Sequence, residues 1–363
     1  MKDYTGKTIF VGIDVHKKTY SVTAISDSVV VKRDTIKANP SVLITYLNKR
    51  FGTGKIFTAY EAGFSGFHLH RALEEAGIKN IVVHAASIEV SKDRVKTDKR
   101  DSLKIAAHLS HGKLTGINVP TVEREDFRSL TRLRDSFTRE KTRFACKIKA
   151  ILFQYGLMGP DDDKRVSLTW IKKLSELETT PGIKYAIQQH AEMWLTYDKK
   201  IKEIDVKVKE QAIQDQTIDV VYQSTPGVGP TSARALANEL GDLQQFKNNK
   251  QLGSYIGLTP SEHSSGEHVR QGHITKQGKP ILRKILVQVA WTAIRHDEEL
   301  YSIYERISSR AGPKRAIIAI ARIIICRIRA CFRTNTLYTP KKVVKPKEEE
   351  ALKMKKCSLE LAA

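Results

Sequence analysis

The chain has 363 residues, enough for two or three domains with sizeable cores. Lysine and arginine number 62 against 40 acidic residues, so the formal net charge is +22, and the excess is spread along the chain. Such a surface attracts polyanions, with nucleic acid the leading candidate and anionic membrane the second. The membrane alternative is weak, because arginines interrupt the most apolar stretch, 316–331, before it reaches the roughly 20 residues of a membrane helix.

The cysteines and the first residues bear on the compartment. The four cysteines are far apart and form no CxxC pair, which disfavours a disulfide framework or a zinc site. Cys326 and Cys331 fall on a helical stretch and are interpreted as packing residues. The start, MKDYTGK, lacks the apolar core of a signal peptide. We therefore expect a protein of the reducing cytosol.

Residues 1–110 predict an α/β domain. Three strand patterns separated by short polar turns suit an antiparallel meander, and helices then alternate with two further strands. The expected ranges are 7–15, 19–25 and 29–36 for the meander, and then 40–50, 56–62, 66–76, 80–85 and 87–109. The order βββαβαβα is that of the ribonuclease H-like fold.

The first strand, in TIFVGIDVHK, carries one carboxylate, Asp14, among apolar neighbours. A charge in such a run costs free energy unless a cation or a metal ion compensates for its desolvation. The alternative is an aspartate that reaches solvent at the end of the strand.

Three further carboxylates follow downstream. Glu61 ends the fourth strand, and Asp98 and Asp101 lie three residues apart at the start of the last helix, so they share one helix face. Four converging carboxylates repel one another unless divalent cations neutralise them, and hard oxygen ligands select Mg²⁺ or Mn²⁺. Two such ions about 3.5–4 Å apart are the apparatus of phosphodiester chemistry. Taken singly, either helix aspartate is equally well explained as part of a solvated, charged helix start.

The middle of the chain predicts two long helices, at 123–156 and about 187–213, that suit an antiparallel hairpin or coiled-coil arm. A basic helix face is most often solvated surface. On a chain of +22, however, eight cations on the first helix favour phosphate contact. They are Arg128, Arg132, Arg134, Arg139, Lys141, Arg143, Lys147 and Lys149.

Residues 226–240, PGVGPTSARALANEL, form a glycine-rich turn that leads into a helix. The stretch resembles a helix-hairpin-helix element, whose glycines let backbone N–H groups approach a phosphate. A plain capped turn is the alternative. A short helix is expected at 246–258.

The polar loop at 259–278 is rich in functional groups. Ser265, or less favourably Ser264, is a candidate nucleophile beside cations that could stabilise phosphorane charge. As the alternative, both serines are turn residues. Helices are expected at 280–295 and 313–333, the second with a basic stripe of Arg315, Arg322 and Arg329, and 336–363 predict a disordered tail.

Five motifs in this order resemble the transposases (recombinases) of the IS110/IS1111 insertion-sequence family, over nearly the whole chain. They are FVGIDVHK, AYEAGFSGF, KTDKRDSLKIA, PGVGPTSARALANELGD and GLTPSEHSSGEHVRQGHITKQGKPILRKIL. The resemblance implies a RuvC-like domain at 1–120, a helical linker at 121–220, and a mostly helical C-terminal transposase domain at 221–335.

The resemblance also implies the site. The DEDD tetrad of the family maps onto Asp14, Glu61, Asp98 and Asp101, which would hold Mg²⁺. The catalytic serine, which precedes a glycine in the family, maps onto Ser265, and Ser264 directly before it leaves the assignment open by one residue.

Members of the family are similar to site-specific DNA recombinases guided by a noncoding bridge RNA. They work as dimers that pair into tetramers, in the bacterial cytoplasm at the nucleoid. The implied reaction on donor and target DNA passes through a 5′-phosphoserine link and needs no ATP, and the sequence holds no GxxxxGK[ST] motif. Two alternatives are a RuvC-like structure-selective nuclease that uses water as its nucleophile, and a non-catalytic nucleic-acid-binding protein.

Overall fold

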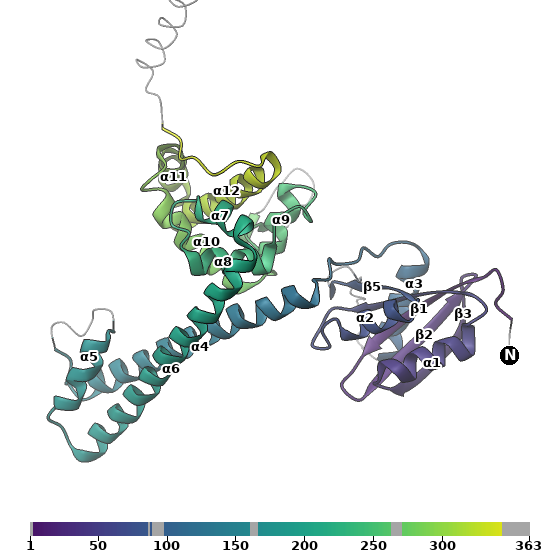
Figure 1. Ribbon diagram of the computed structural model, residues 1–363, viewed down its shortest axis with the longest axis horizontal. Coiled ribbons are helices and arrows are strands. Elements are labelled where there is room, and N and C mark those ends of the chain that lie inside the picture. Colours follow the sequence, from purple (N-terminus) through teal and green to yellow (C-terminus); the bar gives the residue numbers. More distant parts are fainter. Residues whose placement is uncertain (1–2, 86–87, 89–97, 160–165, 263–270, 343–363) are drawn as a thin grey trace, which may run out of the picture. The chain divides into compact units, whose positions relative to one another are not determined.

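The computed structural model describes residues 3–85, 88, 98–159, 166–262 and 271–342 (Figure 1). Two compact units divide the chain, Met1–Pro120 and Thr121–Ala363. The finer division of the second unit at residues 220 and 335 stays a prediction.

Stretches rich in β-branched and aromatic residues build the five-stranded sheet of the first unit. Its strands are β1 (Thr8–Val15), β2 (Thr19–Ser26), β3 (Val29–Lys37), β4 (Lys55–Glu61) and β5 (Lys79–Val83). The order across the sheet is β3-β2-β1-β4-β5. Strands β1, β2 and β3 pair antiparallel, and β1, β4 and β5 pair parallel. The predicted meander and the two later strands are confirmed to within two residues at their ends.

Helices pack on both faces of this sheet. Helices α1 (Pro40–Phe51) and α2 (His68–Glu75) share one core with the inward side chains of β1, among them Ile9, Val11 and Ile13, all fully buried. Helix α3 (Asp98–Ser110) covers the other face, toward which a side chain at position 12 would point. A Cβ atom on Gly12 would overlap the carbonyl oxygen of Ser102 and the amide nitrogen of Ala106. The glycine therefore lets the main chains of strand and helix approach directly.

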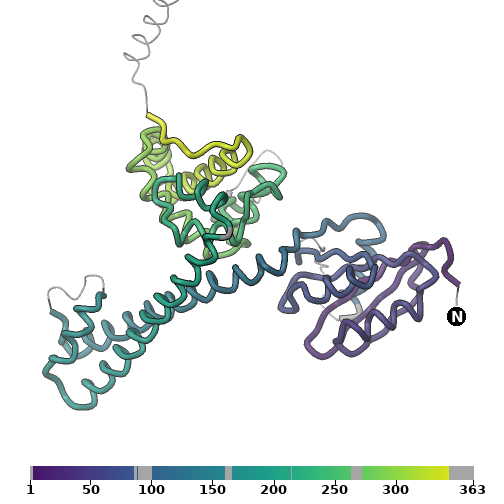
Figure 2. Tube along the Cα trace, in the orientation of Figure 1, coloured from purple at the N-terminus to yellow at the C-terminus, as the bar shows by residue number. Residues whose placement is uncertain are grey.

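The second unit begins with the predicted helical hairpin (Figure 2). Helices α4 (Val122–Gln154) and α6 (Pro181–Gln214) run side by side, with α5 (Leu168–Lys173) and a 3₁₀ turn (Leu174–Glu176) between them in the chain. Near the far end of the hairpin, Ile148, Leu152 and Trp194 belong to one buried cluster.

The rest of the second unit packs around one apolar core, which includes Leu236, Leu286 and Ile324. Its helices are α7 (Gln216–Gln223), α8 (Pro230–Leu240), α9 (Asn249–Ile256), α10 (Pro280–Ala293), α11 (Glu298–Ala311) and α12 (Pro313–Thr334). Helix α11 was not expected from the sequence, although four of its residues fall at helical spacing, namely Leu300, Ile303, Tyr304 and Ile307. Ile303 and Tyr304 pack partly buried against the core.

Two predictions for this region need correction. The loop at 259–278 is not irregular throughout, because β6 (Pro260–Glu262) and β7 (Gln271–Ile274) pair antiparallel at its two ends. The predicted tail is also wrong for 336–342. There the Tyr338 hydroxyl donates to Asp297 Oδ2 at 2.6 Å and accepts from Arg327, and Tyr338 is buried. Residues 343–363 lie outside the described residues.

Candidate active site and nucleic-acid contacts

Two predicted carboxylates belong to adjacent parallel strands. The register of β1 and β4 sets Ile13 opposite Tyr60, so the next residues in line are Asp14 and Glu61. Opposed residues of parallel strands project from the same face of a sheet. Ile13 and Tyr60 are fully buried in the core with α1 and α2. Asp14 and Glu61 therefore project from the other face, which α3 covers, at the carboxyl ends of their strands.

Asp14 is mostly buried, whereas Glu61 is exposed. The Asp14 side chain is 21% exposed, and its Oδ2 lies 3.1 Å from Nε2 of His16. Sequence reasoning missed His16 as a neighbour of this carboxylate. The signal was available, because residues two apart along an extended chain project from the same face.

Helix α3, which covers this face of the sheet, carries the other two residues of the predicted set. Asp98 is its first residue, although the Asp98 side chain lies outside the described residues. Asp101 is partly exposed, 3.8 Å from Nζ of Lys104. Between β2 and α3, the buried hydroxyls of Thr23 and Ser102 hydrogen-bond at 2.9 Å. This bond anchors the first turns of α3 on the sheet.

The register thus assigns Asp14 and Glu61 to one face of the sheet, and Asp101 belongs to the helix that covers this face. The Asp98 side chain is not among those that the structure describes. Among the described side chains, no three histidines, cysteines, aspartates or glutamates form a group that could hold a metal ion. The candidate nucleophiles Ser264 and Ser265 follow β6 and precede β7 in the chain, and both lie outside the described residues.

The basic face of α4 contacts carboxylates of its own chain, contrary to the expectation of phosphate contact. Arg132 forms a bidentate pair with Glu239, at 2.6 and 2.9 Å. Further along the helix, Arg134 pairs with Asp205 and Lys141 with Asp198, both on α6. The prediction is therefore wrong for these three cations, since their carboxylate partners neutralise them. Sequence could not reveal this, because the partners lie 57 to 107 residues away.

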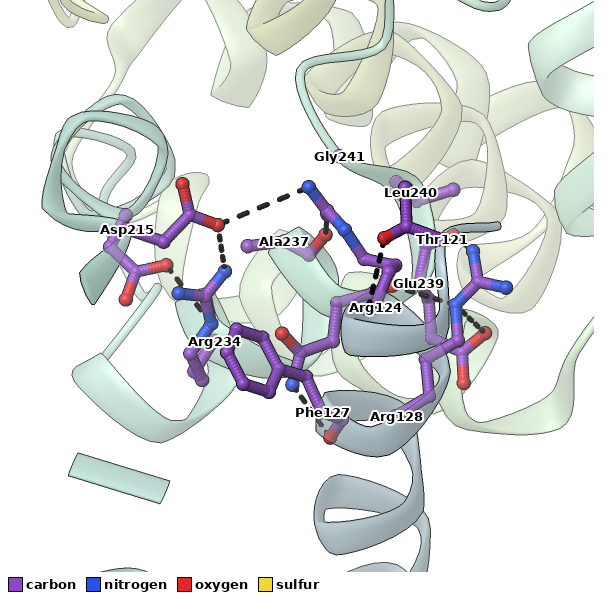
Figure 3. A network of polar contacts seen from close by, with 12 residues as sticks. Thr121, Arg124, Phe127, Arg128, Asp215, Arg234, Ala237, Glu239, Leu240 and Gly241 are labelled. Carbon is purple, nitrogen blue, oxygen red and sulfur yellow. Dashed lines mark hydrogen bonds and ion pairs between the residues drawn. The ribbon is translucent and has the colours of Figure 1, made fainter. Parts of the chain in front are cut away.

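The carboxyl end of α8 is held by arginines of α4 (Figure 3). Arg124 donates to the carbonyl oxygen of Ala237. Arg128 donates to the carbonyl oxygens of Asn238 and Glu239, at 2.8 and 3.0 Å. The last carbonyls of a helix lack partners within the helix and carry partial negative charge, so guanidinium groups satisfy both needs.

A second part of the same network surrounds Arg234, which is fully buried on α8. Its Nη2 donates to Asp215 Oδ2 at 2.8 Å, and its Nε lies 3.6 Å from Asp219 Oδ1 (Figure 3). Burial raises the pKa of Asp219 to about 6, and the positive charge of Arg234 opposes this shift.

The glycine-rich turn before α8 has two glycines in different surroundings. Gly227 has φ +89°, and a Cβ there would lie 2.7 Å from Cβ of Thr292 on α10, so this glycine serves close packing. Gly229, which precedes Pro230 at the start of α8, has open space around it. Both glycines are exposed, so the turn keeps the accessible backbone that a helix-hairpin-helix contact requires, and Gly227 serves close packing as well.

The predicted basic stripe of α12 is not a uniform surface. Arg315 is exposed, Arg322 is half-buried, and Arg329 is buried. Arg329 donates to the carbonyl oxygens of Phe246 and Lys247 at 2.7 and 3.0 Å, and to Asn249 Oδ1 at 3.1 Å. Of the three, Arg329 is therefore a structural residue, which corrects its assignment to phosphate contact.

Comparison with known proteins identifies the family to which the chain is similar. Residues 11–157 match a family model described as "Transposase", of the DEDD IS110 type, and residues 221–305 match that of the "Transposase IS116/IS110/IS902 family". The transposase for insertion sequence element IS1111A of Coxiella burnetii is 26% identical, over 85% of either chain. The transposase for insertion sequence element IS1533 of Leptospira borgpetersenii is 24% identical, over 96% of this chain and 99% of that one.

These matches identify the chain as a DNA transposase, an enzyme that cuts and rejoins DNA. The chain belongs to the IS110 family. Within the described residues, no helix combines the length and the apolar composition needed to cross a membrane.

Proposed function

We propose that this transposase has a ribonuclease H-like first unit and exchanges DNA strands through a 5′-phosphoserine link, with Ser265 as the nucleophile. The observation that carries the proposal is the β1–β4 register. It aligns Asp14 with Glu61 on the face covered by α3, the helix that Asp98 opens and that also carries Asp101.

The donor chemistry of the four candidate residues suits a divalent cation. Asp14 is a mostly buried carboxylate at the carboxyl end of a central strand, and all four candidate ligands supply the hard oxygen atoms that Mg²⁺ or Mn²⁺ prefers. A bound Mg²⁺ supplies charge stabilisation at the scissile phosphate. Asp14, Glu61, Asp98 and Asp101 are the residues that hold it.

In the proposed reaction Ser265 Oγ attacks the phosphorus atom and loses its proton to solvent or a neighbouring base. The Oγ–P bond forms, the P–O3′ bond breaks, and the departing 3′ oxygen takes up a proton. A 3′-hydroxyl of the exchanged strand then attacks the phosphoserine and releases the serine hydroxyl. The number of phosphodiester-type bonds is unchanged throughout, so no nucleoside triphosphate is consumed.

The partners belong to the same proposal. Donor and target DNA are the substrates, and a noncoding bridge RNA selects them by base pairing, in the manner of RNA-guided systems. Homodimers pair into a tetramer at the nucleoid, in the bacterial cytoplasm. The surplus of positive charge over the chain supports binding of several polyanions in one assembly.

The test uses purified protein, RNA from the sequence flanking the element, Mg²⁺, and labelled donor and target duplexes. Wild type forms a covalent protein–DNA adduct, which Ser265→Ala abolishes and Ser264→Ala retains. DNA cut without any adduct would refute the serine mechanism and favour a RuvC-like structure-selective nuclease that uses water.

Asp14→Asn supplies the second arm of this test. The variant keeps its far-ultraviolet circular dichroism and loses both adduct and strand exchange. Retention of strand exchange by this variant would show that the carboxylate serves structure alone.

A further inference from the structure

The corner between α10 and α11 holds a cavity to which the transposase reaction assigns no role. Its volume is about 530 Å³, within the range of roughly 300–1,000 Å³ typical of ligand sites. Aromatic and basic side chains line it, namely Trp291, Arg295, His296 and Tyr301, together with Ile294 and the carboxylates Asp297 and Glu298. The four aromatic and basic residues are exposed, Trp291 by 41% and Tyr301 by 47%.

The floor of the cavity is firmly built. Asp297 is fully buried, and its Oδ1 caps α11 by accepting from the amide of Leu300 at 3.0 Å. Its Oδ2 accepts from Arg327 at 3.0 Å and from the Tyr338 hydroxyl at 2.6 Å. The corner is therefore fixed before any ligand arrives, which lowers the entropy cost of binding.

The aromatic walls are held as well. Trp291 packs against Tyr304 of α11 in a T-shaped contact, with ring centroids 5.8 Å apart and planes at 63°. Arg295 lies just beyond the end of α10, where its amide donates to the carbonyl oxygen of Thr292 at 3.0 Å, and both Arg295 and Trp291 line the cavity.

The charge on this corner is available to a ligand. Among the described residues, no carboxylate lies within ion-pair distance of Arg295, in contrast with Arg132 and Arg134 of α4. A large exposed indole beside an unpaired guanidinium is the combination that binds single-stranded nucleic acid. The base stacks on the ring, and the cation contacts the adjoining phosphate.

We infer that the α10–α11 corner binds one unpaired nucleotide, with Trp291 and Tyr301 as stacking surfaces and Arg295 as the phosphate contact. The ligand is an unpaired base, which either has been flipped out of a duplex or belongs to a single-stranded segment. Such bases arise both in DNA opened for strand exchange and in the loops of a structured RNA. The inference assumes that the chain acts on nucleic acid, but it does not depend on the four candidate metal ligands or on Ser265.

Equilibrium binding of the full-length protein in EDTA tests the site without strand cleavage. The probes are labelled duplexes that are either fully paired or carry one unpaired nucleotide, each made in DNA and in RNA. Trp291→Ala weakens binding of the unpaired probe by about 5- to 150-fold, the range that loss of one stacked base entails, and leaves the paired probe unchanged. Trp291→Phe keeps most of the affinity, because a stacking surface remains.

Further variants sharpen the result. Tyr301→Ala weakens the same probe, and Tyr185→Ala does not, since Tyr185 is an exposed aromatic of α6 that does not line the cavity. Arg295→Gln lowers the slope of log affinity against log salt by about 0.7–0.9, one phosphate contact. The kind of probe, DNA or RNA, whose affinity falls more in Trp291→Ala identifies the nucleic acid that occupies the site.

Two results would overturn the inference. In one, Trp291→Ala binds the unpaired probes of both kinds as wild type does. In the other, it weakens paired and unpaired probes equally. If Trp291→Ala fails to fold, Trp291→Phe combined with Tyr301→Ala replaces it, with the same required difference between probes.

Discussion

Replacing Gly12 by alanine should separate α3 from the sheet without touching any candidate catalytic residue. The new Cβ would lie 3.0 Å from Cα of Ala106, and closer still to the Ser102 carbonyl oxygen. The tightest overlap sets the shift, because the new Cβ would lie 2.1 Å from the Ser102 oxygen. Carbon and oxygen atoms approach to about 3.3 Å, so α3 must retreat by about 1 Å or more, or the strand must bend. Both obstacles are main-chain atoms of a helix, and neither can rotate away.

The magnitude follows from two contributions. Overpacking of this kind costs about 1–3 kcal/mol. The Thr23–Ser102 hydrogen bond, now 2.9 Å, would stretch toward or beyond the limit of such bonds and forfeit about 0.5–1.5 kcal/mol. We expect a loss of about 2–4 kcal/mol in the stability of the first unit. Strand exchange should fall by about 100-fold, because a displacement near 1 Å at a catalytic group has that effect.

Urea denaturation followed by circular dichroism measures the first effect, and the adduct assay measures the second. Gly63→Ala is the matched control. Gly63 lies two residues after Glu61, and the nearest atom to its added Cβ is 4.0 Å away. Wild-type stability and activity in Gly12→Ala would refute the close approach of α3 to β1.

Two further predictions concern buried charges in the second unit. Arg329→Met should lower the urea midpoint of unfolding, because three hydrogen-bond acceptors lose their donor. Arg315→Gln should leave this midpoint unchanged and weaken DNA binding at low salt. The reverse pattern would contradict the burial of Arg329. Folded Asp219 holds its proton more tightly than the unfolded chain does, since its pKa is raised from 3.8 to about 6. Its contribution to stability is greatest below pH 3.8 and is lost as the pH rises to about 6. The stability difference between wild type and Asp219→Asn should therefore decline across that window and stay level above it. A difference that does not vary with pH would argue against this burial effect.

The first unit could be predicted closely because its signals are local. The three strands of the meander are eight or nine residues long and rich in valine, isoleucine and threonine, and asparagine, proline and glycine mark the ends of α1. Gly12 carried a usable signal too, since a glycine inside a buried strand indicates close approach of another backbone. That signal was not applied.

The second unit was harder to predict because its determinants are distant in sequence. The nine lysines and arginines of α4 form a basic pattern, but the carboxylates that neutralise Arg132, Arg134 and Lys141 come from α6 and α8. Helix α11, by contrast, carried local signals that were not used, namely the Asp297 cap and apolar residues at helical spacing from Leu300 to Ile307. For the candidate site, residue types and order sufficed to choose Asp14 and Glu61. The sheet register that aligns them required the structure.

The junction of α4 with α8 uses two kinds of atoms, and relatives of this chain should record the difference. Arg124 and Arg128 bind main-chain carbonyls, which every residue supplies, so positions 237 and 238 can change without compensating changes in those arginines. Arg132 and Glu239 meet side chain to side chain, so a change in one favours a matching change in the other. Correlated substitution should therefore be strong between positions 132 and 239 and absent between 128 and 238. In an alignment, the contact between α4 and α8 would then appear as covariation between positions 132 and 239, but not between positions 128 and 238.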